Sequence, residues 1–158
     1  MKIEIRKVKI KDAQGILDVL NPIIKTQNFS SMKEENTLAD QTNFIQNLPS
    51  NAIYNLAFDL ENLEIVGIQD ILPQSKNFNG TGEISTFVNL NYHRQGIGER
   101  LMKATLREAK DLGYKKIQAI IRTDNRIAIS FYKKNGFREM GSERIFYELN
   151  LLKKARQN

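Results

Sequence analysis

The sequence of 158 residues contains no cysteine, no tryptophan and a single histidine. The lack of cysteine excludes a disulfide framework, a thiolate metal site and a cysteine nucleophile. One histidine also excludes a histidine-rich metal site, although carboxylates alone could bind a hard cation, and we expect no metal. No apolar run is long enough to span a bilayer, and the N-terminus lacks the apolar core of a signal peptide. We therefore expect a cytoplasmic protein with no membrane partner.

Charge of one sign is only moderately in excess. Lys and Arg total 24 against 18 acidic residues, so the net charge is +6. A basic balance suits nucleic acid, an anionic membrane or a polyanionic small ligand. Because the basic residues are spread along the chain without a nucleic-acid motif, we expect no nucleic-acid partner. The length and the 41% of hydrophobic residues suit one domain, which we assign to residues 1–158.

The stretch 83–112 organises the rest of the sequence. Its first part has the β-branched and aromatic composition of a strand, and apolar residues recur at helical spacing over 97–112. The loop between them holds Gly96 and Gly98 next to Arg94. A helix N-terminus carries unpaired N–H groups and a partial positive charge, and glycines let a ligand approach the backbone. The loop therefore predicts a phosphate or pyrophosphate site, with a tight turn that binds nothing as the alternative.

Hydrophobic patterns outline the remaining elements. Strands are expected at 2–8, 52–59, 63–72 and 116–122, with one or two more in 137–151, and helices at 12–20, 37–48 and 127–134. Asp12 is expected to cap the first helix and Pro22 to weaken its end. Gly67 is expected to mark a β-bulge. This order predicts a mixed α/β fold with a twisted central sheet, flanking helices and a parallel βαβ unit over 83–122.

Two segments resemble the signatures of a known family. Residues 93–98, His-Arg-Gln-Gly-Ile-Gly, resemble the pyrophosphate loop Arg/Gln-x-x-Gly-x-Gly/Ala of the GNAT N-acetyltransferase superfamily. Residues 125–137 resemble its second signature, an Asn followed by an Ala, a Tyr and Gly-Phe. One departure is His93, which stands where the family usually has Arg or Gln. Glu83 and the loop spacing are most similar to the phosphinothricin acetyltransferase group.

The resemblance implies a GNAT-like acyl-CoA N-acyltransferase fold and transfer of an acetyl group from acetyl-CoA to a small-molecule amine. It makes Glu83 the candidate general base, directly or through water, and Tyr132 the general acid for the thiolate. An exposed strand edge at 87–88 would bind the pantetheine arm like an added strand, and Asn125 would hold the same arm. The expected cofactor-binding residues are Phe87, Val88, His93, Arg94, Gln95, Gly96, Ile97, Gly98, Asn125 and Tyr132.

Each of these roles has a plainer alternative. Glu83 could be a solvated strand residue, Tyr132 a core aromatic and Asn125 a turn residue. His93 is not assigned as the base, because its place in the motif points toward the phosphates and away from the thioester. A homodimer is a family-level expectation only.

The sequence leaves the acceptor open. An amino acid analogue, a polyamine, an aminoglycoside, and a protein N-terminus or lysine are all candidates, as is a non-catalytic acyl-CoA-binding domain. We expect the acceptor pocket near 26–31, 73–82 and the C-terminal strands. A basic protein is a poor match for a polycationic acceptor, unless local charge overrides the total.

Overall fold

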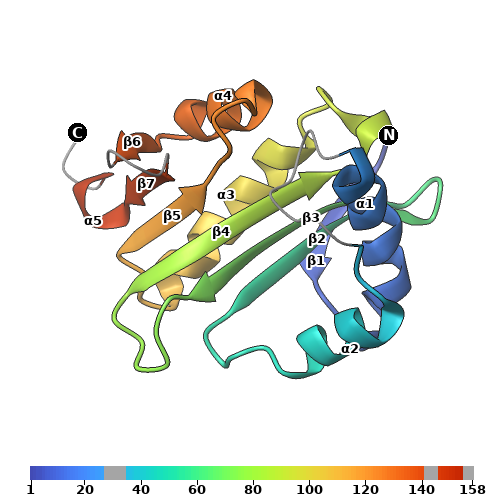
Figure 1. Ribbon diagram of the computed structural model, residues 1–158, viewed down its shortest axis with the longest axis horizontal. Coiled ribbons are helices and arrows are strands. Elements are labelled where there is room, and N and C mark those ends of the chain that lie inside the picture. Colours follow the sequence, from blue (N-terminus) through green and yellow to red (C-terminus); the bar gives the residue numbers. More distant parts are fainter. Residues whose placement is uncertain (27–34, 141–145, 155–158) are drawn as a thin grey trace.

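The computed structural model describes residues 1–26, 35–140 and 146–154 (Figure 1). A seven-stranded sheet has the order β1-β2-β3-β4-β5-β7-β6. Its strands are β1 (Ile3–Lys7), β2 (Ile53–Asp59), β3 (Glu64–Pro73), β4 (Thr81–Val88), β5 (Lys116–Ile120), β6 (Arg138–Met140) and β7 (Phe146–Asn150). The pair β4–β5 is parallel and the other pairs are antiparallel, so the sheet is mixed, as expected.

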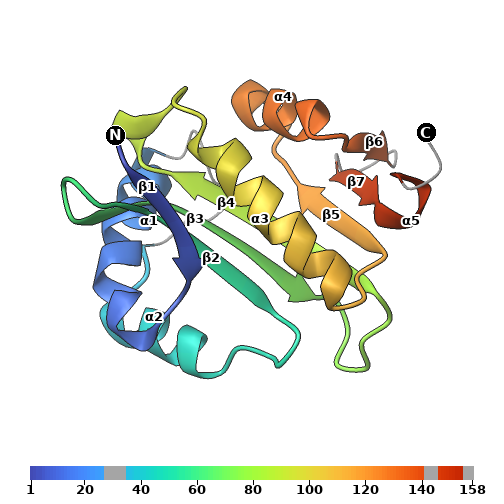
Figure 2. The same ribbon diagram turned by 180° about the vertical axis from the view of Figure 1, so that it is seen from behind.

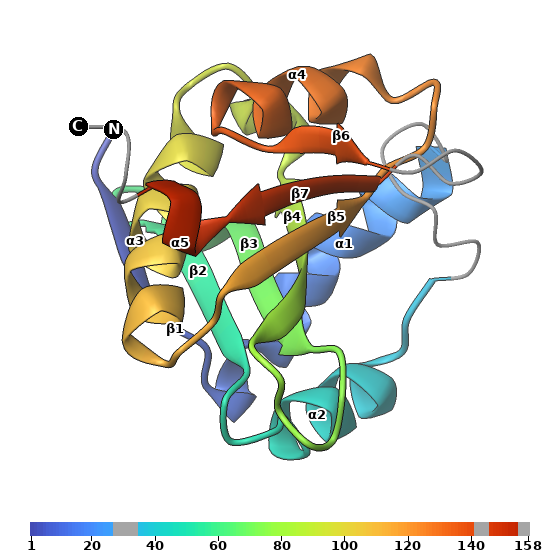
Figure 3. The same ribbon diagram turned by 90° about the vertical axis from the view of Figure 1, so that its left-hand side faces the viewer.

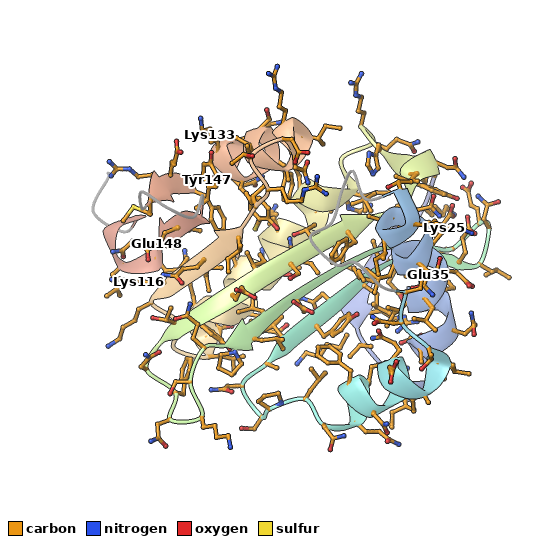
Figure 4. All side chains as sticks on the ribbon, in the orientation of Figure 1. Lys25, Glu35, Lys116, Lys133, Tyr147 and Glu148 are labelled. Carbon is orange, nitrogen blue, oxygen red and sulfur yellow. The ribbon has the colours of Figure 1, made fainter. Side chains whose placement is uncertain are left out.

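Helices cover both faces of this sheet. They are α1 (Ala13–Thr26), α2 (Leu38–Gln46), α3 (Ile97–Asp111), α4 (Arg126–Lys134) and the short α5 (Leu151–Lys154), with 3-10 turns η1 (Ile10–Asp12) and η2 (Leu90–Tyr92). α3 crosses the face opposite α1 and α2 (Figures 2 and 3). In the layer that α3 and α4 share with the sheet, Tyr147 of β7 is buried, whereas Lys133 of α4 points outward (Figure 4).

A β-bulge lets α3 pack closely on the sheet. The register of β2 and β3 shifts between Ala57 and Phe58, next to Gly67, which confirms the expected bulge. A Cβ on Gly67 would lie 2.9 Å from Cγ2 of Ile97 and 3.1 Å from Cδ1 of Leu101. The missing side chain therefore brings the start of α3 against β3.

The first helix is longer than the sequence predicted. α1 continues through Pro22 to Thr26, instead of ending near residue 20. Ile23 and Ile24, just after the proline, are each only 1% exposed. Burial of two large apolar side chains offsets the backbone hydrogen bond that proline removes, because each such burial contributes about 1.5–3 kcal/mol.

The prediction that Asp12 caps this helix is wrong. Asp12 ends η1, which continues directly into α1. Its carboxylate accepts two hydrogen bonds from the Arg6 guanidinium, both 2.8 Å, and one from the Lys9 N–H at 2.7 Å. Burial alone would raise the pKa of Asp12, but the Arg6 and Lys9 hydrogen bonds outweigh it and hold that pKa below its ordinary value. Asp12 thus ties β1 to the start of α1.

Asp12→Asn is expected to lower the free energy of unfolding by about 2–3 kcal/mol at pH 7, because it leaves the Arg6 charge without its partner. A lowered carboxyl pKa contributes stability that is lost as pH falls through the folded-state value. The difference from wild type should therefore shrink at pH 3, as measured by urea unfolding. Glu4→Gln, at an exposed carboxylate 3.9 Å from Arg6, is the control and should have little effect. An Asp12→Asn difference that stays constant with pH would contradict the ion pair.

Candidate active site

The sheet opens between β4 and β5. These strands pair only over Thr81–Glu83 and Lys116–Gln118, although β4 runs on to Val88. Asn89 donates its N–H to the Val66 carbonyl of β3 at 2.8 Å. Because backbone directions alternate along a strand, residues 86 and 88 direct their N–H and C=O groups away from β3, into the opening. An extended ligand can therefore pair with this edge, as an added strand would.

Two cavities meet at this opening. The first, here the loop cavity, has a volume of about 490 Å³ and lies between the end of β4, the loop before α3, and α4. The second, here the sheet cavity, has a volume of about 540 Å³ and lies between α1, α2, β3, β4 and the end of β5. The residues that line both are Thr86, Phe87, Asn125, Ala128 and Tyr132. Ligands in the two cavities would touch beside these side chains.

The start of α3 forms one wall of the loop cavity. The helix begins after Gly96 without a side-chain cap, so its first N–H groups are available to an anion. Gly96 has φ = 78°, and a Cβ there would meet nothing within 4 Å. Gly98 has a different reason: a Cβ would lie 2.8 Å from Cε1 of Phe131, so this glycine lets α4 pack against α3. Arg94, with φ = 63°, and Lys134 add positive charge.

Tyr92 connects the loop before α3 to the β2–β3 turn. The Tyr92 hydroxyl in η2 lies 2.7 Å from Oε1 of Glu64 and 3.0 Å from Oδ2 of the buried Asp59, both at the β2–β3 turn. The hydrogen bond to Glu64, followed by burial, raises the pKa of Tyr92 to about 12. The loop before α3 is thus anchored to a turn distant in sequence.

All the cofactor residues expected from the sequence line the loop cavity, except Gln95, which is exposed and lies outside its lining. Nε2 of His93 lies 2.9 Å from the Val88 carbonyl oxygen. A carbonyl can only accept, so His93 donates through a protonated Nε2. The imidazole therefore lies against the end of β4. Lys134, which pairs with Glu99, was not predicted.

Asn125 and Tyr132 both have the plainer structural roles, and each also lines both cavities. Oδ1 of Asn125 caps α4 by accepting the Ala128 N–H at 3.1 Å, which leaves Nδ2 as the donor for a ligand. Tyr132 is 5% exposed and packs edge-on against Phe131 and Phe137. Its hydroxyl lies 2.9 Å from Oγ1 of Thr86. Burial raises the pKa of Tyr132 well above its ordinary value, so the phenol is neutral and can act as a proton donor near pH 7.

The sheet cavity contains a carboxylate that sequence reasoning missed. Asp70 of β3 lies opposite Tyr54 on one side and Ser85 on the other, so it shares a face with the half-buried Glu83. Burial, and then the negative charge of Glu83, raise the pKa of Asp70 to about 7. The available signal was a single acid on a strand face otherwise occupied by Ile68 and Leu72. Two neighbouring carboxylates can share one proton near neutral pH.

Asp70→Asn is expected to raise the free energy of unfolding, relative to wild type, by about 2 kcal/mol more at pH 8 than at pH 5. A carboxyl whose folded-state pKa is raised contributes stability below its unfolded pKa, and this is lost as pH rises through about 7. Asparagine carries no charge at either pH and avoids this loss. Paired urea unfolding curves of wild type and variant at the two pH values give the difference. The same shift at both pH values would show that Asp70 ionises normally.

In 1–26, 35–140 and 146–154, no helix is long and apolar enough to cross a membrane. The same part of the chain has no cluster of three or more His, Cys, Asp or Glu side chains that could hold a metal ion.

Comparison with known proteins agrees with this architecture. The model of the Acetyltransferase (GNAT) family matches residues 22–137. The chain therefore belongs to the GNAT acetyltransferase family, which confirms the expected family and enzyme class, an acyltransferase.

Particular relatives extend the comparison. YwnH of Bacillus subtilis (strain 168), whose name places it with the phosphinothricin acetyltransferases, is 31% identical over 64 residues, or 40% of this chain and 39% of that relative's length. A phosphinothricin acetyltransferase from Sinorhizobium meliloti, solved with acetyl-CoA, superposes with a TM-score of 0.85 at 16% identity, over 96% of this chain and 89% of that one. An N-acetyltransferase from Staphylococcus aureus Mu50 superposes with a TM-score of 0.85 at 21% identity, over 96% of this chain and 99% of that one. The two structures confirm the predicted GNAT-like fold.

Proposed function

We propose that this chain transfers the acetyl group of acetyl-CoA to the amine of a small cationic molecule. The observation that carries this proposal is the meeting of two cavities beside Tyr132. One offers a helix N-terminus and cations to an anionic ligand, and the other offers carboxylates to an amine.

The loop cavity is the proposed site of the co-substrate. The pyrophosphate would lie at the start of α3 beside Gly96 and Arg94, where N–H groups and positive charge converge. The pantetheine arm would run along the open edge of β4 toward Tyr132. The Val88 carbonyl already accepts from His93, so the Val88 N–H and the backbone of Thr86 are the groups offered to this arm. Acetyl-CoA in the Sinorhizobium meliloti structure supports this choice.

The proposed chemistry uses a base and an acid from opposite faces of the sheet. Glu83 projects from β4 into the sheet cavity and takes a proton from the acceptor ammonium, directly or through water. The neutral amine then attacks the thioester carbon. As the C–S bond breaks, Tyr132 gives its proton to the sulfur. Asp70, whose pKa is raised to about 7, can share a proton with Glu83 and is the alternative base if Glu83→Gln keeps full turnover.

The lining of the sheet cavity favours a cationic acceptor. Its described residues include three carboxylates, those of Asp40, Asp70 and Glu83, and one cation, Arg122. Arg122 is paired with Asp124 at 2.7 Å. An acceptor with two acidic groups would meet mainly like charge here, whereas a diamine or amino sugar would be attracted. The positive net charge of the whole chain therefore does not argue against a cationic acceptor.

A thermal melt is the first experiment, with acetyl-CoA, free coenzyme A and adenosine nucleotides as ligands. A ligand that binds only the folded state raises the Tm, and acetyl-CoA should raise it more than the nucleotides do. Thiol release from acetyl-CoA is then followed with diamines, amino sugars, amino acids and peptides. We expect turnover with diamines or amino sugars. No Tm shift would remove the cofactor site, and a shift without turnover on any amine would favour a non-catalytic acyl-CoA-binding domain.

The same assays test the other partners. Turnover on peptides alone would make a protein N-terminus or lysine the acceptor. We propose no nucleic-acid partner, and a steep salt-dependent affinity for DNA or RNA would contradict this.

A further inference from the structure

A short chain of hydrogen bonds leads from the sheet to the Tyr132 hydroxyl. Gln69 of β3 lies opposite Thr86 of β4 and is fully buried. Its Nε2 donates to Oγ1 of Thr86 at 3.0 Å. Oγ1 of Thr86 in turn lies 2.9 Å from the Tyr132 oxygen, where either hydroxyl can be the donor.

The amide of Gln69 is held in this orientation by its surroundings. Its Nε2 faces two acceptors, the Thr86 oxygen and, at 3.9 Å, the sulfur of Met102. Oε1 is buried without a hydrogen-bond partner in the structure. A flipped amide would turn Oε1 toward those two acceptors and leave both N–H groups where Oε1 now finds no partner, which would be worse. The N–H therefore occupies one lone pair of Thr86.

We propose that Thr86, supported by Gln69, is a positioning residue that stabilises the phenolate of Tyr132 while its proton is on the leaving thiol. This inference rests on the proposed function. The Thr86 hydroxyl has one proton and two lone pairs. Because Gln69 fills one lone pair, Thr86 can accept from neutral Tyr132 with the other, or turn its own proton toward the phenolate. A hydroxyl that already accepts a hydrogen bond is a stronger donor.

The step balances without a further reactant. The electron pair of the C–S bond goes to sulfur, the Tyr132 proton follows it, and the Thr86 proton turns to the phenolate oxygen. The acceptor nitrogen loses two protons in all, the first to Glu83. The second restores Tyr132 through water, and Glu83 releases its proton to solvent. The pKa of Tyr132 is raised by burial and lowered by the Thr86 hydrogen bond, which agrees with this role for Thr86.

Thr86→Val removes the hydroxyl at nearly constant shape. We expect kcat to fall about 10- to 100-fold, with the KM for acetyl-CoA little changed, because a hydrogen bond to a charged oxygen is lost. Thr86→Ser should restore most of kcat. Gln69→Met, which removes the supporting N–H, should cause a smaller loss in the same direction.

A double-mutant cycle separates this role from a structural one. In a Tyr132→Phe background, Thr86→Val should cause no further loss, because there is no phenolate to stabilise. Losses that multiply would overturn the proposal. The matched control is Thr105→Val: Thr105 is also fully buried and also accepts an amide N–H, from Asn55 at 3.1 Å, but lines neither cavity. Thr105→Val should change stability without changing kcat.

A titration of Tyr132 tests whether Thr86 stabilises its phenolate, and it requires no acetylation. Difluorotyrosine, a more acidic phenol, is incorporated at all five tyrosines, and the fluorine signal lost in Tyr132→Phe identifies residue 132. Thr86→Val should raise the titration midpoint of that signal by about one pH unit, and Thr105→Val should leave it unchanged. An unchanged midpoint in Thr86→Val overturns the inference even if the enzyme is active. If no amine is acetylated, the proposed function fails and the titration still decides on Thr86.

Discussion

Glu83→Gln is expected to lower kcat by about 10²–10³ at pH 7, while the Kd for acetyl-CoA stays within about two-fold. General base catalysis by a positioned carboxylate contributes roughly this much. The loss falls on kcat because Glu83 lines the sheet cavity and lies outside the loop cavity, where the co-substrate would bind. At higher pH a larger fraction of the acceptor is already neutral, so the gap between variant and wild type should narrow. Steady-state kinetics from pH 6 to 10, with Kd from calorimetry, measure both quantities.

The control for this variant is Glu148→Gln. Glu148 is a half-buried glutamate of β7 whose Oε1 accepts from Nε2 of Gln118 at 3.0 Å, and it lines neither cavity. Glu148→Gln should therefore leave kcat nearly unchanged. If Glu83→Gln keeps full turnover, Glu83 is not the base. If turnover then collapses in Asp70→Asn instead, the base is Asp70.

Tyr132→Phe is expected to lower kcat with acetyl-CoA by about 10²-fold. Without the phenol, the thiolate must leave unprotonated or take a proton from water. A thioester of a more acidic thiol, which leaves easily as the anion, should therefore lose much less than 10²-fold. The ring is retained, so its contacts with Phe131 and Phe137 and the cofactor affinity should persist.

Tyr147→Phe is the matched control for Tyr132→Phe. Tyr147 is 2% exposed and belongs to the same apolar layer, but lies outside both cavities. It should show wild-type kinetics with both thioesters. Equal losses with acidic and ordinary thiol esters in Tyr132→Phe would mean that the hydroxyl does not protonate the leaving group.

Elements with a strong local signal were predicted well. The apolar stripe over 97–112 corresponds to α3 at Ile97–Asp111, followed by Gly113 with φ = 90°. Two strands, β6 and β7, lie in the segment 137–151, where one or two were expected, and α4 lies within the second motif. Periodicity and turn chemistry act over a few residues, so they can be read without knowing what packs against the segment.

Local rules failed where a distant partner decided the outcome. α1 passes through Pro22 because Ile23 and Ile24 are buried against the sheet. Asp12 binds Arg6 of β1 in place of capping a helix. Of the segment 26–31, which was predicted to shape the acceptor pocket, the structure describes only Thr26, the last residue of α1. Residues 27–31 lie outside the described residues.

The sequence by itself determined the family, the mixed α/β class and a glycine loop at a helix N-terminus, because these depend on short motifs and on periodicity. Only the tertiary structure placed Asp70 beside Glu83, and Thr86 between Gln69 and Tyr132. Such pairs join residues from different strands and helices, and their contacts follow from strand register and from the opening of β4 away from β5. Register is set by packing across the whole sheet, so the partners in the site emerge only when the sheet has formed.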